Sequence, residues 1–389
     1  RIILYPCEFG LDYLPFVVDA AEVDAIVSDR TAFGSSIPHV RYFMPCAHKI
    51  VPQNYDRSAQ CQTEWVLLTS GTVGPPKLVV HTLSSLTGVI RPNQSQPGNV
   101  VWSTFYDIRR YGGLQIFLRA TLTGTSLILS SPEESTSDFL ARAGAHGVTH
   151  ISGTPSHWRR ALMSPSARLM SPEYVRLSGE IADQAILNQL KTAYPQARLA
   201  HAFATTEAGV AFEVNDGDSG FPAGVVEQTP NVEMKIEDQT LRIRSSRTAN
   251  RYLGDHAPEI KDADGFVDTR DMVELRNGRY VFVGRRDGII NVGGIKVHPE
   301  EVEAVINQHP SVRMSMVHAK KNPVTGAIVV ADVILSASAT PPASEGNALQ
   351  REIMHFCRQT LSSYKVPAMI NFVSTLPISE SGKIARSNA

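Results

Sequence analysis

Short apolar runs alternate with segments of helical character over the first 210 residues of the chain. The runs that read as buried strands are residues 100–104, 126–129, 148–151, 175–177 and 199–203. The segments between them that we expect to be helices are residues 114–122, 138–146 and 183–194. This alternation predicts layered α/β subdomains with largely parallel sheets.

The pattern becomes β-rich from about Val232. Residues 232–236 and 241–243 alternate apolar and polar positions around Asp238-Gln239, which predicts a hairpin. Further strands are expected near residues 266–267 and 280–283.

A third pattern begins near Asp287, where His298-Pro299 and the acidic residues after it are typical of a helix start. The elements expected after it are strands at residues 314–318, 328–335 and 369–373, a loop at 336–346 and a helix at 349–361. We therefore predict an α/β protein in two domains. Residues 1–286 form a large N-terminal domain of layered α/β subdomains plus a β-rich subdomain, and residues 287–389 form a small α+β domain.

Composition narrows the classes of partner. The 389 residues carry a net charge of -1, with 42% hydrophobic and 19% charged residues, so no long-range field favours nucleic acid or an anionic membrane. We find no run of about 18 apolar residues that could span a membrane. The four cysteines form no C-x-x-C pair and no zinc-like cluster. They indicate reduced, mostly buried thiols in a cytoplasmic protein.

The strongest local signal follows the apolar strand at residues 65–68. Glycines let backbone N–H groups approach an anion, hydroxyls add donors, and a lysine adds positive charge. The candidate phosphate-binding residues are Thr69, Ser70, Gly71, Thr72, Gly74 and Lys77. The segment is not a Walker A loop, because Pro76 precedes Lys77 and Leu78 follows it. The alternative is a Gly/Pro-rich surface turn.

This loop resembles the phosphate-binding motif T-S-G-[ST]-T-G-x-P-K of the adenylate-forming superfamily, with Val73 in place of the second threonine. That superfamily includes acyl- and aryl-CoA ligases, nonribosomal peptide adenylation domains and luciferases. Further motifs of the family follow in the same order, so the resemblance covers about residues 65–386. Residues 1–64 match weakly, and we expect the chain to be short at its N-terminus relative to the family.

Two of these motifs are expected to bind the nucleotide. Ser178-Gly179-Glu180 resembles the segment whose backbone lies along the adenine. Phe203-Ala204-Thr205-Thr206-Glu207 resembles the Y-G-x-T-E motif. By this resemblance, Phe203 stacks on the purine, Thr206 bonds the α-phosphate and Glu207 holds Mg²⁺, which prefers oxygen ligands. Without the resemblance, Thr206-Glu207 would be read as a helix N-terminal pair.

The β-rich region supplies two more motifs. Thr269-Arg270-Asp271 resembles T-G-D, with Arg270 in place of glycine, and Asp271 is then expected to accept hydrogen bonds from the ribose hydroxyls. Arg285 matches an arginine that contacts ribose and phosphate, and Asp287 matches the hinge of a mobile C-terminal domain. The alternative for the first motif is a polar hairpin turn.

Gly293 and Gly294 match the strand edge that lines a pantetheine tunnel, where the absence of side chains leaves room for a thiol. A glycine-rich hairpin is the alternative. Near the C-terminus, Pro377 to Arg386 resembles P-x-x-x-x-G-K-x-x-R. Lys383 then matches the catalytic lysine that bridges the carboxylate and the α-phosphate; the alternative is a solvated surface lysine.

The acid pocket gives a weaker signal. Arg110 stands near the position of a histidine common in CoA ligases, which suggests a polar wall that pairs a second anionic group of the substrate. The alternative is an arginine that faces the nucleotide or solvent. Gly113 lies in the same gate segment. His157 is a candidate for the acyl tunnel, or else part of a helix start under the sheet.

The resemblance implies an acid-thiol ligase that forms an acyl-AMP from a carboxylic acid and Mg-ATP and passes the acyl group to coenzyme A. A stand-alone adenylation enzyme that loads a carrier protein in trans is an alternative. The second alternative is a non-catalytic nucleotide-binding derivative. The presence of Lys77, Glu207, Asp271, Arg285 and Lys383 together argues against it.

Overall fold

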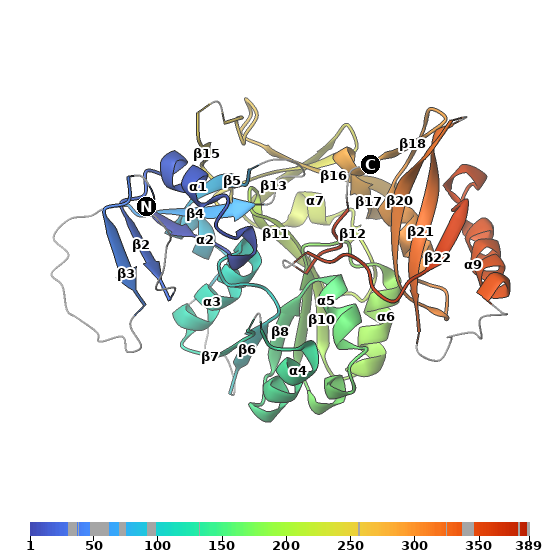
Figure 1. Cartoon of the computed structure of the whole chain (residues 1–389), viewed down its shortest axis with the longest axis horizontal. Coiled ribbons are helices and arrows are strands. Elements are labelled where there is room, and N and C mark those ends of the chain that lie inside the picture. Colours follow the sequence, from blue (N-terminus) through green and yellow to red (C-terminus); the bar gives the residue numbers. More distant parts are fainter. Residues whose placement is uncertain are drawn as a thin grey trace.

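The computed structural model describes residues 1–29, 37, 39–46, 62–69, 75–91, 99–131, 133–255, 257–323, 325–336, 346–379 and 382–386. Its elements form an α/β architecture in which the C-terminal elements lie to one side of the larger part (Figure 1). The predicted fold class is confirmed. Short 3-10 turns occur at η1 (Cys7–Phe9), η2 (Pro165–Leu169), η3 (Arg286–Gly288) and η5 (Ser363–Lys365).

A six-stranded sheet in the order β11-β10-β9-β8-β6-β7 forms the base of the larger part. Its strands are β6 (Val101–Thr104), β7 (Ser126–Leu129), β8 (His150–Gly153), β9 (Tyr174–Ser178), β10 (Arg198–Thr205) and β11 (Gly209–Val214). The pairs β6–β7, β6–β8, β8–β9 and β9–β10 are parallel, and β10–β11 is antiparallel. The predicted parallel strands are therefore confirmed.

Helices cover both faces of this sheet. On one face, Ile151, Val175 and Leu177 pack with α4 (Thr136–Ala145), α5 (Pro155–Ala161) and α6 (Gln184–Ala193). On the other, Trp102 and Tyr174 pack with α3 (Tyr111–Thr123). The alternation of Tyr174 and Val175 between these clusters follows from the two-residue period of a strand.

A second sheet, in the order β1-β4-β5-β15, lies toward the N-terminus. Its strands are β1 (Ile2–Leu4), β4 (Glu64–Thr69), β5 (Lys77–Thr82) and β15 (Arg251–Leu253). Nearby elements are α1 (Leu14–Ala20), α2 (Leu83–Thr87) and the parallel pair β2 (Ala25–Ser28) and β3 (Tyr42–Pro45). Thr69 and Lys77 are register partners in the antiparallel β4–β5 pair. The candidate phosphate segment therefore joins these two strands.

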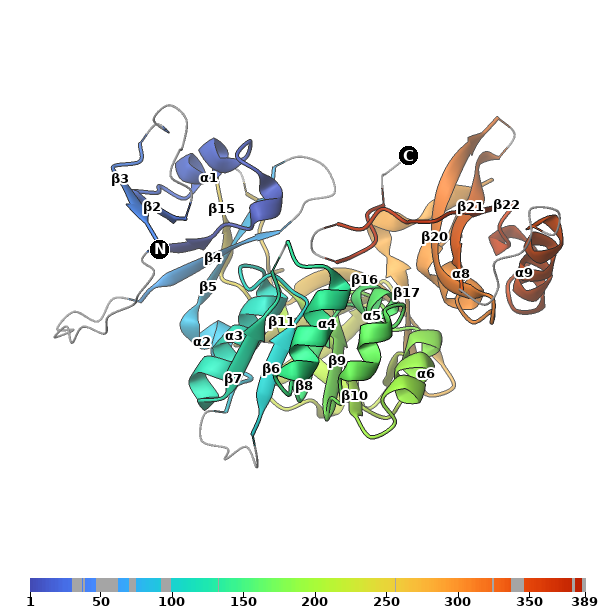
Figure 2. The same cartoon turned by 60° about the horizontal axis from the view of Figure 1, so that its bottom comes forward.

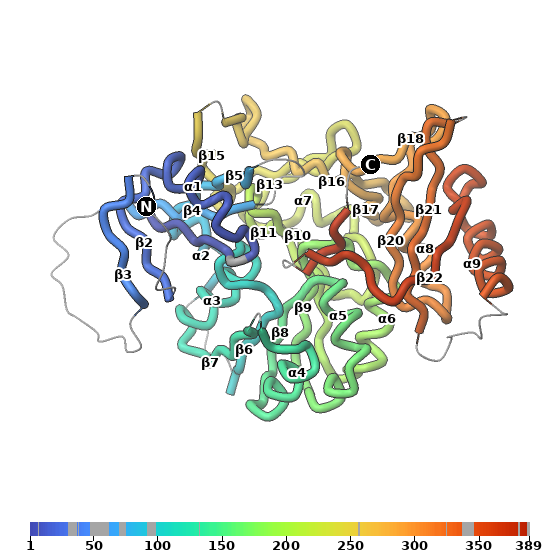
Figure 3. Tube along the Cα trace, in the orientation of Figure 1, coloured from blue at the N-terminus to red at the C-terminus, as the bar shows by residue number. Residues whose placement is uncertain are grey.

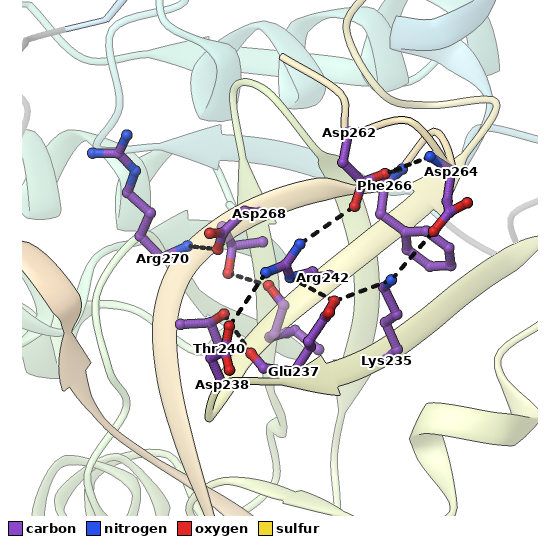
Figure 4. Close-up of polar contacts among 12 residues, drawn as sticks. Lys235, Glu237, Asp238, Thr240, Arg242, Asp262, Asp264, Phe266, Asp268 and Arg270 are labelled. Carbon is purple, nitrogen blue, oxygen red and sulfur yellow. Dashed lines mark hydrogen bonds and ion pairs between the residues drawn. The ribbon is translucent and has the colours of Figure 1, made fainter. Parts of the chain in front are cut away.

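The β-rich region forms a five-stranded sheet in the order β12-β17-β16-β14-β13. Its elements are β12 (Phe221–Pro222), α7 (Val225–Gln228), β13 (Val232–Glu237), β14 (Thr240–Ser245), β16 (Val267–Arg276) and β17 (Arg279–Arg285). The predicted hairpin is confirmed, since Asp238 and Gln239 have φ of 50° and 60° at the turn between β13 and β14. Figure 4 shows Arg242 of β14 between Glu237 at 3.2 Å and Asp262 at 3.4 Å. These ion pairs connect β14 to its neighbour β13 and to the segment that precedes β16.

The C-terminal unit has its own apolar cluster, drawn from residues 290–372 among the described residues. Its elements are β18 (Ile290–Val292), β19 (Ile295–Val297), α8 (Pro299–Ile306), β20 (Val312–Asn322), β21 (Gly326–Leu335), α9 (Gly346–Thr360) and β22 (Met369–Phe372). The domain boundary at Asp287 stays a prediction, which this segregation of apolar residues supports.

After β22, the tail (residues 373–379 and 382–386) crosses back toward α5 and the six-stranded sheet (Figures 2 and 3). Thr154 Oγ1 donates a hydrogen bond of 2.6 Å to the Gly382 carbonyl oxygen. The tail therefore contacts the larger part directly.

Two further predictions concern thiols and membranes. Cys357 and Cys46 are both free thiols, as predicted. Cys357 is buried but Cys46 is exposed, so burial holds for one of these two described cysteines. Among the described residues, every helix is too short or too polar to cross a lipid bilayer.

Candidate functional site

Two of the predicted nucleotide-binding segments meet at one edge of the six-stranded sheet, next to Thr154, which was not predicted. Thr154 follows β8, Gly179 follows β9, and Thr206 and Glu207 follow β10. Because these three strands are parallel neighbours, their carboxyl ends lie at the same edge. Ligands of open α/β sheets commonly bind at this edge.

Thr206 and Glu207 lie in the turn between β10 and β11, so the alternative of a helix N-terminal pair is wrong. His81 Nε2 donates a hydrogen bond of 2.7 Å to the Thr206 carbonyl oxygen, and His81 Nδ1 lies 3.0 Å from Ser85 Oγ. Burial lowers the pKa of His81 to about 4, which keeps the ring neutral. His81 thus supports the turn. Sequence reasoning missed it, although a histidine inside the apolar strand β5 was a signal that a polar partner was needed.

Glu207 connects this turn to the N-terminal sheet. Its Oε1 accepts a hydrogen bond of 3.1 Å from the Tyr252 hydroxyl of β15. The Lys77 ammonium lies 5.3 Å from the centre of the Tyr252 ring. Thr69 ends β4 opposite Lys77. The other predicted phosphate-binding residues, Ser70, Gly71, Thr72 and Gly74, lie outside the described residues.

Asp271 and Arg285 are register partners on β16 and β17, with 3.9 Å between Arg285 Nε and Asp271 Oδ1. Arg270 has φ of 61°, a left-handed conformation that glycine adopts most easily. The backbone expected from T-G-D is therefore kept without the glycine. Arg270 Nη1 also donates to Asp287 Oδ2 at 2.9 Å. Residues 269–271 lie within β16, so the alternative of a polar hairpin turn for the T-G-D-like motif is wrong.

The tail brings Lys383 to the same edge. An ideal Cβ on Gly179 would lie 3.2 Å from Lys383 Cε, so the absence of a side chain at Gly179 leaves room for the lysine. Desolvation lowers the pKa of the Lys383 ammonium, while Glu180 and Asp271 attract it. The side chain nevertheless stays exposed to solvent. Lys383 therefore lies among the predicted nucleotide residues while a ligand could still reach it; its catalytic role stays a prediction.

His157 lies in the first turn of α5, as the helix-start alternative expected. Its ring is stacked on Phe105, with 5.3 Å between ring centres, and an ideal Cβ on Gly382 would come within 1.7 Å of His157 Cε1. Burial lowers the pKa of His157 to about 3. The ring thus packs against the tail, and a role in the acyl tunnel stays a prediction.

Arg110 precedes α3 and forms an ion pair with Glu8. Its Nη1 donates to the Leu68 carbonyl oxygen at 3.0 Å, and its guanidinium lies 4.6 Å from the centre of the Phe9 ring. Sequence reasoning missed Glu8, which supplies a carboxylate from within the chain. Pairing of Arg110 with an anionic group of the substrate therefore stays a prediction and would compete with Glu8.

Gly113 of α3 packs too closely for a side chain, because an ideal Cβ would lie 2.2 Å from the Asp107 carbonyl oxygen.

Phe203 of β10 is stacked on Phe212 and Phe282, with ring centres 5.7 and 5.2 Å apart. Its neighbours Ala204 and Thr205 complete the strand, and the Thr205 hydroxyl accepts a hydrogen bond from the Ala208 amide at 2.9 Å. Roles of these residues at an acid or a purine stay predictions.

Gly293 and Gly294 form the turn between β18 and β19, with φ of 60° and 89°. Both are exposed. The glycine-rich hairpin read as an alternative is therefore present, and a role beside pantetheine stays a prediction.

Comparison with known families agrees with this arrangement. The profile described as "AMP-binding enzyme" matches residues 43–247, and that described as "AMP-binding enzyme C-terminal domain" matches residues 301–383. The chain belongs to the AMP-binding enzyme family. The resemblance to the adenylate-forming superfamily is thereby confirmed.

Curated relatives of this AMP-binding enzyme include CoA ligases. It is 23% identical over 339 residues to the 2-succinylbenzoate–CoA ligase of Staphylococcus epidermidis, covering 82% of this chain and 68% of the relative. It is 29% identical over 351 residues to the acyl-CoA ligase ppsA of Aspergillus oryzae, covering 82% of this chain and 60% of the relative. The chain thus spans about three fifths to two thirds of these relatives.

Solved structures share the fold of this AMP-binding enzyme. The anthranilate CoA ligase AuaEII in complex with anthranoyl-AMP has a TM-score of 0.76 at 20% identity, covering 96% of this chain and 78% of that one. The o-succinylbenzoate CoA synthetase of Bacillus subtilis in complex with ATP and magnesium has a TM-score of 0.71 at 20% identity, covering 97% and 81%.

One prediction follows from the charge state of Asp271. Burial raises its pKa to about 6, with Glu300 and Glu207 adding to the shift and Arg285 and Lys383 opposing it. Ionising this carboxyl therefore costs folding free energy, a cost that is absent below about pH 4 and grows as pH rises through about 6. We expect ligand-free Asp271→Asn to exceed wild type in unfolding free energy by about 1 to 3 kcal/mol at pH 7 and by little at pH 4.

Denaturant unfolding of the AMP-binding enzyme at the two pH values measures this difference. The matched control is Asp264→Asn, at an exposed aspartate of the same region. An Asp271→Asn difference that is the same at pH 4 and pH 7 would contradict the assigned charge state.

Proposed function

We propose that this chain is an AMP-forming carboxylate–CoA ligase. It activates a carboxylic acid with Mg-ATP as the acyl-AMP and transfers the acyl group to coenzyme A. The observation that carries the proposal is the position of Lys383, a residue of the tail, at the carboxyl ends of β8, β9 and β10 beside Gly179, with Asp271 and Glu180 attracting its ammonium.

In the first step, a carboxylate oxygen of the acid attacks the α-phosphorus of ATP. The bond from that phosphorus to the bridging oxygen breaks, and pyrophosphate leaves. Lys383 places its ammonium beside the reacting groups, where negative charge increases in the transition state. Asp271 accepts hydrogen bonds from the ribose hydroxyls, and Arg285 is its register partner on the neighbouring strand β17. Positioning and charge neutralisation carry most of such a transfer.

The residues present fit a magnesium ion bound together with the triphosphate. Mg²⁺ usually takes one or two protein carboxylates plus phosphate oxygens. Glu207 supplies such a carboxylate at the strand ends, oriented by the Tyr252 hydroxyl. The ion would neutralise charge on the triphosphate and on the leaving pyrophosphate, and Glu207 is the residue that would hold it.

In the second step, the tail withdraws as the C-terminal unit turns about Asp287, and the thiol approaches past Gly293 and Gly294. The thiol sulfur attacks the acyl carbon, the bond to the phosphate oxygen breaks, AMP leaves, and the thiol proton passes to solvent. The CoA-ligase relatives favour coenzyme A as the acceptor. A carrier protein with a pantetheine thiol is the alternative acceptor.

A panel of carboxylic acids with Mg-ATP tests the proposal. We expect at least one acid to give acyl-AMP and pyrophosphate in equal amounts. Added CoA should then give the thioester and AMP faster than a pantetheine-loaded carrier protein does. Transfer to the carrier protein alone would overturn the choice of acceptor. An absence of pyrophosphate with every acid would favour a non-catalytic nucleotide-binding protein.

A further inference from the structure

The tail packs against the C-terminal unit and forms ion pairs with it. Ile378 and Ile384 form an isolated antiparallel bridge, and both pack against a cluster that contains Met314 and Met316. Arg386 pairs with Glu300 at 2.9 Å and with Glu303 at 2.6 Å, both on α8. Lys383 is therefore carried on a short hairpin that is bound to this unit by apolar packing and ion pairs.

Two side chains of the larger part hold this hairpin on either side of Lys383. Thr154 Oγ1 donates to the carbonyl oxygen of Gly382 at 2.6 Å. Glu180 Oε1 accepts from the backbone N–H of Ile384 at 2.9 Å. The main chain is thus fixed at the residue before the lysine and at the residue after it.

Both anchoring side chains are themselves held in place. The Thr154 hydroxyl also accepts the His157 amide at 3.0 Å as the cap of α5, and Thr154 is fully buried. Glu180 accepts from the Ser156 amide at 2.9 Å and from the Ser156 hydroxyl at 3.0 Å. Hydrogen bonds to an ionised carboxylate are stronger than those between neutral groups. The first turn of α5 therefore holds both side chains that bind the tail.

We propose that Thr154 and Glu180 are positioning residues that dock the Gly382–Ile384 main chain and so aim the Lys383 ammonium at the reacting phosphate. The inference rests on the proposed function, and it gives the Glu180 carboxylate a role distinct from the adenine segment expected from the resemblance. Since both hydrogen bonds link the larger part to the tail, they exist only while the tail is docked.

The consequence is a split between the two half-reactions. Weaker docking reduces acyl-AMP formation, which needs Lys383 at the strand ends. It spares thioester formation from supplied acyl-AMP, which takes place with the tail withdrawn. A residue with only a structural role would lower both half-reactions together.

The experiment compares Thr154→Val, Glu180→Gln and Glu180→Ala with wild type, with Thr154→Ser as the conservative control. Valine keeps the shape of threonine but loses the donor, whereas serine keeps both the donor and the helix cap. With an acid that the enzyme accepts, we expect Thr154→Val and Glu180→Ala to lower ATP–pyrophosphate exchange by about 10- to 100-fold, Glu180→Gln to lower it less, and Thr154→Ser to stay within about twofold. Thioester formation from supplied acyl-AMP should change less than about threefold in all four.

A second readout needs no catalysis. Hydrogen exchange of the peptide that contains Ile384, followed by mass spectrometry, reports the bond to Glu180 directly, and it should speed up in Glu180→Ala and Thr154→Val. The docking role would be overturned if Glu180→Ala and Thr154→Val changed neither the hydrogen exchange of this peptide nor the rate of ATP–pyrophosphate exchange. An equal fall in both half-reactions would overturn it as well. If wild type forms no acyl-AMP with any acid while these variants still expose the tail peptide, the docking holds and the proposed function fails.

Discussion

Lys383→Ala is expected to lose about 100- to 1000-fold in acid-dependent ATP–pyrophosphate exchange, the usual effect of removing one group aimed at developing charge. The reason is the placement of Lys383 beside Gly179, where Glu180 and Asp271 draw its ammonium toward the nucleotide residues. The same variant should still form thioester from supplied acyl-AMP and CoA, because that step does not use the lysine.

The matched control for Lys383→Ala is Lys321→Ala, at an exposed lysine on β20 of the same C-terminal unit. It removes the same charge from the same unit without touching the strand ends, and it should behave as wild type. Undiminished pyrophosphate exchange in Lys383→Ala would refute the catalytic assignment.

Gly382→Ala is expected to reduce acyl-AMP formation as severely, by about 100-fold or more, although it alters no charged group. Gly382 has φ of 75°, and an added Cβ would lie 1.7 Å from His157 Cε1. The ring cannot yield easily, since it is stacked on Phe105 within the buried first turn of α5. The tail should therefore be displaced from its seat, which leaves thioester formation from acyl-AMP intact. The two half-reactions, measured separately, check this.

Two further variants separate the collision from backbone strain. Gly326→Ala adds a Cβ at φ of 74°, and among the described residues no atom beyond its two chain neighbours would lie within 4 Å of it. It therefore carries the strain alone and should keep wild-type pyrophosphate exchange. His157→Ala combined with Gly382→Ala removes the colliding ring and should recover part of the lost exchange. Loss in Gly326→Ala equal to that in Gly382→Ala would show that strain, and not the contact with His157, is responsible.

Local patterns predicted most of the fold. The parallel strands β6, β8 and β9 were visible as short apolar runs because they are buried on both faces. The turn at Asp238-Gln239 was visible because two polar residues stood between alternating strands, and both have positive φ in the structure. Arg270 shows the limit of reading residue types, since its backbone adopts the left-handed conformation that a glycine was expected to provide.

The contacts that complete the candidate site could not be read from local sequence. Thr154 and Gly382 are 228 residues apart, and Glu180 and Ile384 are 204 apart. Only the folded topology brings such pairs together. In the same way, the sequence suggested a substrate anion as one partner for Arg110 and gave no sign of Glu8, which lies beside it. The motifs therefore indicated which residues gather at the carboxyl ends of β8, β9 and β10, and the structure adds what holds them.

The most direct measurement of the central claim is a crystal structure of this chain with Mg-ATP or a stable acyl-AMP analogue. We predict the ribose on Asp271 and the α-phosphate within about 3 Å of the Lys383 ammonium, with the tail on Thr154 and Glu180. A nucleotide bound at the carboxyl ends of β8, β9 and β10 while Lys383 lies far from its phosphates in every form, or a nucleotide bound elsewhere, would contradict the account.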